Sequence, residues 1–340
     1  MTGSLLEIRD LRIEFPSLER TVKAVRGASL DVAKGEVMGL VGESGSGKSM
    51  TALACLGLVP PPGRVTGSVR LDGHEVVGAS EAENERLRGA VAAMIFQNPG
   101  KALNPFFTLG RQLTDAIARV RVIPRVEAEQ AALAALTEVR IGDPKVALHK
   151  YPHQVSGGQL QRVMIAMALA CRPQLVIADE PTTALDVTIQ AQVIVLLRDL
   201  AREHGLTVLF ITHDLGVVGS LCDRLAVMYA GRVVESGPVD ALFASPAHPY
   251  TASLLRAVPM LGRGRSVLTQ IPGTVPNMAA PPPGCAFHPR CPAAGPRCAA
   301  EDPVAKEVAG LRSVACHYPL AAPGAAGEAL AVPVASRAGS

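Results

Sequence analysis

The feature that most constrains this chain is a glycine-rich loop, G-E-S-G-S-G-K-S, at Gly42–Ser49. The apolar segment Val37–Gly42 before it predicts a buried strand, and Lys48–Leu58 after it predicts a helix. Glycines let such a loop curl so that its N–H groups point at phosphate oxygens, and the helix adds its positive N-terminal end. A chance glycine-rich turn would not need a strand before it and a helix after it. The sequence therefore predicts an α/β domain that binds a nucleotide.

The side chains of this loop suit a nucleoside triphosphate bound with Mg²⁺. Lys48 is expected to neutralise the β- and γ-phosphates, and the Ser49 hydroxyl to bind Mg²⁺. The expected phosphate-binding residues of the loop are Gly42, Ser44, Gly45, Gly47, Lys48 and Ser49.

A second segment supplies carboxylates. The apolar run Leu175–Asp179 predicts a central strand, and it ends in Asp179 followed by Glu180. Asp179 suits Mg²⁺, directly or through water, and Glu180 suits a general base that polarises the attacking water. An apolar run that ends in Asp-Glu is common by itself. The prediction of these two roles is specific because a phosphate loop precedes the run in the same chain.

A third segment, Val155–Gln159, precedes the apolar helix expected at Leu160–Cys171. Ser156 and two glycines, Gly157 and Gly158, at a helix N-terminus would form a second anion-binding surface. A flexible Ser-Gly-Gly linker is the alternative, but the helix pattern begins immediately after it.

Strand-like and helix-like patterns alternate through the first part of the chain. Leu206–Thr212 predicts another strand, and Thr188–His204 predicts a helix with one apolar face. This alternation predicts an α/β fold with a mainly parallel sheet covered on both faces. The stretch from about 99 to 172 has no strand signal and predicts a helical subdomain.

Composition suggests where the domains end. We expect one ATPase-type domain at 1–247, a Pro-, Gly- and Cys-rich extension at 248–319, and a disordered tail at 320–340. Basic residues exceed acidic ones by only three, 33 against 30, so charge does not predict nucleic-acid binding. The mean hydropathy is +0.26, yet apolar runs such as Val163–Cys171 are far shorter than the roughly 20 residues of a membrane span. With charges where a signal peptide would be apolar, the sequence predicts a cytosolic or peripheral protein.

The order of these motifs along the chain resembles that of ABC-transporter ATPases. The phosphate loop, VSGGQ, LVIADE, TALD and ITHD follow one another between about Leu5 and Val239. The resemblance implies a P-loop ABC ATPase domain with an added antiparallel β subdomain. It implies a signature motif at Ser156, Gly157, Gly158 and Gln159, a Q-loop at Gln97, a D-loop at Asp186, a switch histidine at His213 and an adenine-stacking aromatic at Phe15. Gln97 would sense Mg²⁺ and the membrane partner.

Members of this family work as head-to-tail dimers, which implies a second ATPase subunit, identical or related. Each ATP would lie between the phosphate loop of one subunit and the signature of the other. That arrangement explains why one chain carries two anion-binding surfaces.

Longer segments resemble the ATPase subunits of oligopeptide and dipeptide importers. They include YPHQVSGG, FQNPGKALNP, HPYTASLL and GCAFHPRCPAAGPRC. This resemblance implies ATP hydrolysis that energises peptide import, with two permease subunits, an extracytoplasmic peptide-binding protein and a place at the cytoplasmic face of the membrane. Nickel, glutathione or another small solute is an alternative cargo. A non-transport ATPase acting on ribosomes or DNA is disfavoured, because neither tandem ATPase domains nor a long coiled coil is visible, and we expect no nucleic-acid partner.

Four cysteines are crowded near the C-terminus, at Cys285, Cys291, Cys298 and Cys316. Disulfides are disfavoured in the cytosol, and structural zinc usually has more closely spaced cysteine pairs. Four thiolates suit a [4Fe–4S] cluster, and the segment resembles the peptide-importer tail that holds one. Zn²⁺, with His288 or His317 as further ligands, and free thiols are the alternatives, as is a redox protein whose ATPase is regulatory.

Overall fold

The computed structural model describes residues 3–17, 19–183, 185–257, 271–308 and 311–320. The chain divides into two compact units that alternate along the sequence. The first comprises residues 1–6, 32–36 and 70–211, and the second comprises 7–31, 37–69 and 212–340. The domains expected from composition follow one another along the chain with a boundary between 247 and 248, whereas these units each combine several segments, so that boundary stays a prediction. Of the predicted disordered tail, residues 321–340 lie outside the described residues.

The first unit contains a parallel sheet in the order β8-β7-β6 and most of the helices. Its elements are β5 (His74–Glu75), α2 (Glu81–Leu87), β6 (Ala92–Ile95), α3 (Pro99–Ala102), α4 (Leu109–Arg121), α5 (Arg125–Glu138), α6 (Pro144–His149), α7 (Gly157–Ala170), β7 (Leu175–Asp179), α8 (Val187–Glu203) and β8 (Thr207–Thr212), which ends at the unit boundary. In register, Leu175 pairs with Ala92 on one side and with Thr207 on the other. Every residue of β7 and β8 is buried, and β7 has a parallel neighbour on each side.

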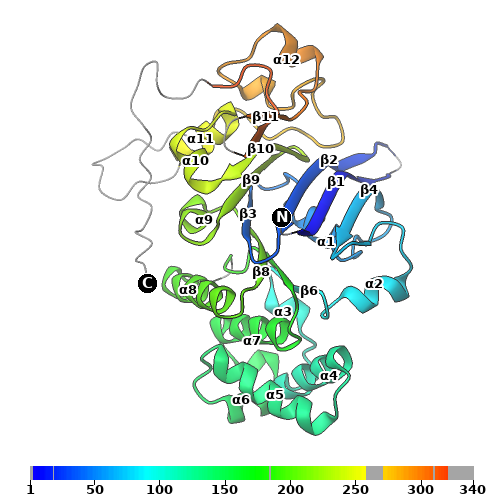
Figure 1. Cartoon of the computed structure of the whole chain (residues 1–340), viewed down its shortest axis with the longest axis vertical. Coiled ribbons are helices and arrows are strands. Elements are labelled where there is room, and N and C mark those ends of the chain that lie inside the picture. The colour runs from blue at the N-terminus through cyan, green and yellow to red at the C-terminus, as the bar shows by residue number, and fades with distance from the viewer. Residues whose placement is uncertain (1–2, 18, 184, 258–270, 309–310, 321–340) are drawn as a thin grey trace. The chain divides into compact units, whose positions relative to one another are not determined.

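From α3 to α7 every element that the structure describes is a helix, and the existence of a helical subdomain stays a prediction. In α4, Leu109, Leu113 and Ile117 are spaced four apart and fully buried, so one face of the helix packs while the charged residues between them face water. Figure 1 shows α4, α5 and α6 gathered beside α7, and contacts join α5 to each of the others. Thr108 caps α4 by accepting a hydrogen bond from the Arg111 N–H, 3.3 Å away.

The second unit contains a mixed sheet in the order β11-β12-β10-β9-β3. Its elements are β1 (Ser4–Phe15), β2 (Val22–Ala33), β3 (Val37–Val41), α1 (Lys48–Ala54), β4 (Arg64–Leu71), α9 (Leu215–Leu221), β9 (Arg224–Tyr229), β10 (Arg232–Pro238), α10 (Val239–Ala244), α11 (Pro249–Ala257), α12 (Pro296–Ala300), β11 (Lys306–Val308) and β12 (Arg312–Val314), with ends of β1, β2 and β4 falling in the first unit. β3 runs parallel to β9, whereas β9, β10, β12 and β11 pair antiparallel. A smaller sheet has the order β2-β1-β4-β5. Parallel strands thus carry the loop that follows β3, and antiparallel strands continue the sheet toward the cysteine-rich segment.

Helix α1 is shorter than its predicted range, which extended to Leu58. It ends at Ala54 because Gly57 adopts a left-handed conformation, with φ of 63°. The N–H of Leu58 then donates to the carbonyl of Leu53, 2.9 Å away, as in a glycine-terminated helix. Among the described residues no helix is long and apolar enough to cross a membrane.

Candidate nucleotide site

The phosphate loop connects β3 to α1, as the sequence predicts. Gly45 and Gly47 have φ angles of 78° and 102°, which favour glycine. A Cβ on Gly47 would lie 2.6 Å from the carbonyl oxygen of Ala24. The local conformation therefore needs glycine at this position, and it places Gly47 at the N-cap of α1.

Lys48 lies across this loop and is only 5% exposed. Its Nζ donates to the carbonyl oxygens of Gly42 and Glu43, at 2.8 and 3.0 Å, and lies 3.5 Å from the Ser46 hydroxyl. A buried ammonium bonded to the loop itself holds a positive charge where anionic phosphates are expected to bind. Lys48, Gly42 and Ser46 are thus brought together in one turn.

The first unit brings together Gln97 and Glu180. Glu180 follows β7 with φ of 44°, an uncommon conformation for a side chain of this size. Its N–H donates to the carbonyl of Ile211 at 2.9 Å. The Gln97 side-chain amide donates to its Oε2 at 3.1 Å, and the Thr183 hydroxyl donates to the same oxygen at 2.7 Å. Sequence reasoning missed Thr183, although its position three residues after Glu180 was a usable signal.

Asp179, the other carboxylate predicted to serve Mg²⁺, ends β7 and is 6% exposed. Oxygen ligands from carboxylates and hydroxyls are those that Mg²⁺ prefers. Asp179 in the first unit and Ser49 in the second each offer an oxygen ligand of this type, and their role toward Mg²⁺ stays a prediction.

The predicted signature forms the start of α7. Ser156 accepts a hydrogen bond from the Gln159 N–H at 3.3 Å, and the Gln159 side chain accepts one from the Ser156 N–H at 3.1 Å. This reciprocal capping box fixes the helix start. A Cβ on Gly158 would lie 2.7 Å from Ile189, so a close approach to α8 requires glycine there. Gly157 is exposed and contributes an open N-terminal turn.

Three further predicted residues lie at element boundaries. Asp186 is exposed at the N-cap of α8. His213 is exposed between the end of β8 and Asp214, which caps α9. Phe15 is half-buried at the end of β1, where a Cβ on Gly63 would be 2.9 Å from its ring. Their roles toward nucleotide stay predictions.

The predicted cysteine set gathers in the second unit. All of its members are free thiols. Burial, together with the nearby thiols of Cys285, Cys291 and Cys298, raises the pKa of Cys316 to about 11. The N–H of Cys285 also donates to the carbonyl of Cys298 at 2.8 Å. The cysteines are therefore neighbours, although among the described residues no group of three or more His, Cys, Asp or Glu side chains is arranged to hold a metal ion.

The two histidines considered as alternative zinc ligands lie against backbone carbonyls. His288 Nδ1 is 2.9 Å from the carbonyl oxygen of Cys285, and His317 Nε2 is 2.8 Å from that of Glu301. Those hydrogen bonds give both rings a structural role.

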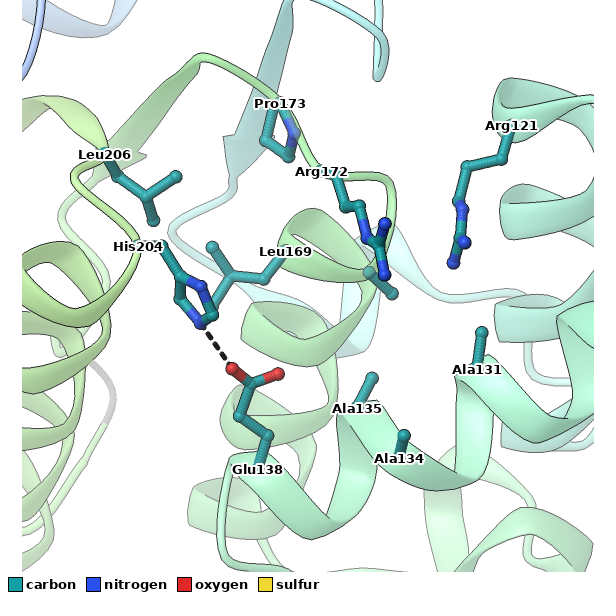
Figure 2. A pocket seen from close by; sticks show the side chains of 11 residues that line it. Arg121, Ala131, Ala134, Ala135, Glu138, Leu169, Arg172, Pro173, His204 and Leu206 are labelled. Carbon is teal, nitrogen blue, oxygen red and sulfur yellow. Dashed lines mark hydrogen bonds and ion pairs between the residues drawn. The ribbon is translucent and has the colours of Figure 1, made fainter.

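A separate cavity of about 460 Å³ opens in the first unit. Figure 2 shows His204 joined to Glu138 on one side, with Nε2 2.5 Å from Oε1, and Arg172 and Arg121 on the other. None of the predicted site residues lines it.

Two family models match the chain. The model described as ABC transporter matches residues 25–183, and the one described as oligopeptide/dipeptide transporter, C-terminal region, matches residues 234–298. The first match includes the phosphate loop, the signature and the β7 carboxylates. The second includes Cys285, Cys291 and Cys298.

Two similar proteins that are peptide transport ATP-binding proteins match most of the length of this chain. The dipeptide transport ATP-binding protein DppD of Escherichia coli (strain K12) is 47% identical over 318 residues, 93% of this chain and 97% of that protein. The oligopeptide transport ATP-binding protein OppD of Salmonella typhimurium is 45% identical over 316 residues, 93% of this chain and 94% of that protein. A solved dimer of an ATP-binding cassette in a post-hydrolysis state, bound to ADP and phosphate, is 27% identical with a TM-score of 0.61, and covers 69% of this chain and 98% of that one.

Proposed function

The chain belongs to the ABC transporter ATPases, in their dipeptide and oligopeptide branch, and from this membership we propose that it hydrolyses Mg-ATP to energise the import of short peptides. The observation that carries the proposal is the 47% identity with DppD, a dipeptide transport ATP-binding protein, over 97% of its length. The phosphate loop and the Gln97–Glu180 pair supply matching chemistry.

In this mechanism the loop N–H groups and Lys48 would hold the β- and γ-phosphates, and Ser49 and Asp179 would hold Mg²⁺. The metal ion supplies neutralisation of the phosphate charge. Glu180, aligned by Gln97, would accept a proton from the water whose oxygen bonds to the γ-phosphorus, while the bond from that phosphorus to the β–γ bridging oxygen breaks and ADP leaves. His213 is proposed to contact the γ-phosphate, and Phe15 to stack on adenine.

We propose a head-to-tail dimer in which Ser156–Gln159 and Asp186 of one subunit complete the site of the other. The solved cassette similar to this chain is a dimer, which supports that arrangement. Two permease subunits would form the path, a peptide-binding protein would deliver the cargo, and the ATPase would lie at the cytoplasmic face. Closure of the dimer on ATP would drive the permeases.

The test is co-purification of the tagged chain from its native membrane, followed by ATPase assays of the complex in proteoliposomes. We expect permeases to accompany it and a peptide-loaded binding protein to stimulate hydrolysis. Stimulation by a nickel- or glutathione-binding protein alone would instead establish another cargo. Hydrolysis with no membrane partner and no transport would contradict the proposal.

We further propose that the cysteine set holds a [4Fe–4S] cluster, which would contribute structure rather than electron transfer. The gathering of the thiols around Cys316 supports it. Protein purified under argon should be brown and should contain about four iron and about four sulfide ions per chain. A colourless, zinc-loaded protein would contradict it. Loss of electron transfer with intact uptake when Cys285 and Cys291 are both replaced would favour the redox alternative.

A further inference from the structure

An ion pair joins the phosphate loop to the cysteine-rich segment within the second unit. Arg290 Nη1 donates to Glu43 Oε2 at 2.7 Å, and Nη2 donates to Oε1 at 3.1 Å. Glu43 is the second residue of the loop Gly42–Ser49, 247 positions away from Arg290. The Arg290 side chain is 4% exposed and that of Glu43 is 25% exposed. A bidentate, largely buried ion pair of this kind is among the stronger side-chain interactions. It fixes the relative orientation of the guanidinium and the carboxylate as well as their distance.

The remaining donors of Arg290 are also bonded. Nε donates to the carbonyl of Pro272 at 2.8 Å, and Nη2 and Nη1 lie 3.4 Å from the Ile271 carbonyl and the Tyr229 hydroxyl. A Cβ on Gly273 would lie 3.1 Å from Arg290 Cγ, so the stem is closely enclosed. The hydrogen bonds that Arg290 donates to the Glu43 carboxylate raise the pKa of Arg290 above its usual value. The guanidinium thus has one orientation, and that orientation points at Glu43.

A second contact holds the same loop residue. The Glu43 N–H donates to the Tyr250 hydroxyl at 2.9 Å. Tyr250 packs against Tyr229 and Phe287, with ring centroids 4.5 and 5.3 Å apart. Both Tyr250 and Phe287 are at most 1% exposed. Glu43 is therefore held at its carboxylate by Arg290 and at its backbone by this aromatic cluster.

The turn that carries Arg290 is also the turn between two of the cysteines. Residues His288–Arg290 form a 3-10 turn in which the Arg290 N–H donates to the Phe287 carbonyl at 2.9 Å. The His288 N–H donates to the carbonyl of Cys285 at 2.9 Å, and the N–H of Cys291 donates to that of His288 at 3.3 Å. A displacement at either cysteine would move Arg290 with it.

We infer that Arg290 is a positioning residue for the phosphate loop, through which the conformation of the Cys285–Cys291 turn sets nucleotide affinity. The physical reason is that Lys48 Nζ donates to the carbonyl of Glu43, 3.0 Å away. Holding Glu43 at its carboxylate and N–H therefore also places the lysine that faces the phosphates. The inference rests on the proposed nucleotide role of the loop.

The test measures ATP and ADP dissociation constants and the melting temperature of the full chain. Arg290→Met should raise both dissociation constants about tenfold, the effect of losing about 1.4 kcal/mol. Arg297→Met is the matched control, because Arg297 lies in the same segment but pairs with Glu301 in an exposed position. It should leave both constants unchanged. If Arg290→Met does not fold, Arg290→Lys is measured instead. Lysine keeps the positive charge but cannot make the bidentate contact with Glu43, so it should weaken nucleotide binding by less than tenfold.

Double variants separate a specific Arg290–Glu43 coupling from general destabilisation, because coupled residues have non-additive effects on nucleotide affinity. Glu43→Gln and Arg290→Met should each weaken binding, and the double variant should be no weaker than either one. Cys291→Ala should weaken binding in the wild-type background but add nothing to Arg290→Met. Wild-type affinity in folded Arg290→Met, or fully additive effects, would overturn the inference. Lys48→Ala is measured in parallel: if it too binds ATP normally, the nucleotide role of the loop has failed instead.

Discussion

Gln97 donates a hydrogen bond from its side-chain amide to Glu180, with Nε2 3.1 Å from Oε2. Gln97 follows β6 and Glu180 follows β7, and these strands are parallel neighbours. Because the carboxyl ends of parallel strands meet at one edge of a sheet, the pair forms where the strands end. The contact orients the carboxylate proposed to act as the general base.

Glu180→Gln should therefore stop turnover while leaving ATP bound. Glutamine keeps the shape and an acceptor oxygen but cannot take a proton, and general-base catalysis contributes about 10²–10⁴-fold. Phosphate release should fall by that order, and a stable ATP-bound dimer should accumulate on a sizing column. Normal hydrolysis in this variant would exclude Glu180 as the base.

Thr183→Val tests the second contact on the same carboxylate. The Thr183 hydroxyl donates to Glu180 at 2.7 Å, and loss of one such bond costs about 1 kcal/mol, or about fivefold in rate. Hydrolysis should slow by that factor with unchanged ATP affinity. Thr137→Val is the control, because the Thr137 hydroxyl donates to a carbonyl of its own helix, that of Leu133. Equal rates for the two variants would show that Thr183 does not align the base.

Lys48→Ala should lose ATP affinity. The substitution removes the charge that lies 2.8 Å from the Gly42 carbonyl oxygen in the loop, and phosphate recognition depends on that charge. Titration calorimetry should show binding weakened by about tenfold or more. Unchanged binding would remove the phosphate-loop assignment.

Ser156→Ala separates a structural cap from a nucleotide contact. Ser156 and Ser80 form the same capping box, on α7 and α2 respectively. Each alanine variant should lose about 1 kcal/mol of unfolding free energy. Only Ser156→Ala should also lose ATP-induced dimerisation, measured by light scattering. Equal loss in the two variants would limit Ser156 to capping.

The sequence predicted the elements whose signals are local. The strand Leu175–Asp179 agrees with β7 at both ends, because five consecutive apolar-to-acidic residues mark a central strand and its edge. The end of α1 at Ala54 was missed because Gly57, inside an apolar helix-like run, adopts φ of 63°. Single glycines are tolerated in helices, so the sequence did not distinguish a stop from an interior position.

The contacts that hold the phosphate loop were beyond reach of sequence reasoning. Glu43 meets the generic loop pattern at a position where any residue is allowed. Arg290 lies among the cysteines, prolines and histidine of the C-terminal segment, none of which indicates a contact with the phosphate loop. Their pairing depends on how β3, β9 and the segment after α11 come together, and no local period encodes it. The residue types of Cys285 and its neighbours were visible, whereas their mutual placement needed the fold.

Acid should destabilise the second unit through His248. This residue is 1% exposed, and its Nδ1 accepts a hydrogen bond from the Tyr250 N–H at 3.0 Å. Burial lowers its pKa from 6.5 to about 3. Between those values the unfolded chain binds a proton that the folded chain does not, so the unfolding free energy falls as pH falls, by about 1.4 kcal/mol per unit. From pH 7.5 to pH 5 this residue should account for a loss of about 2 kcal/mol of unfolding free energy.

His248→Asn keeps an acceptor for the Tyr250 N–H but does not ionise. Urea unfolding at the two pH values should therefore show a smaller difference in unfolding free energy for the variant. An equal difference in both proteins would mean that another group controls the acid sensitivity.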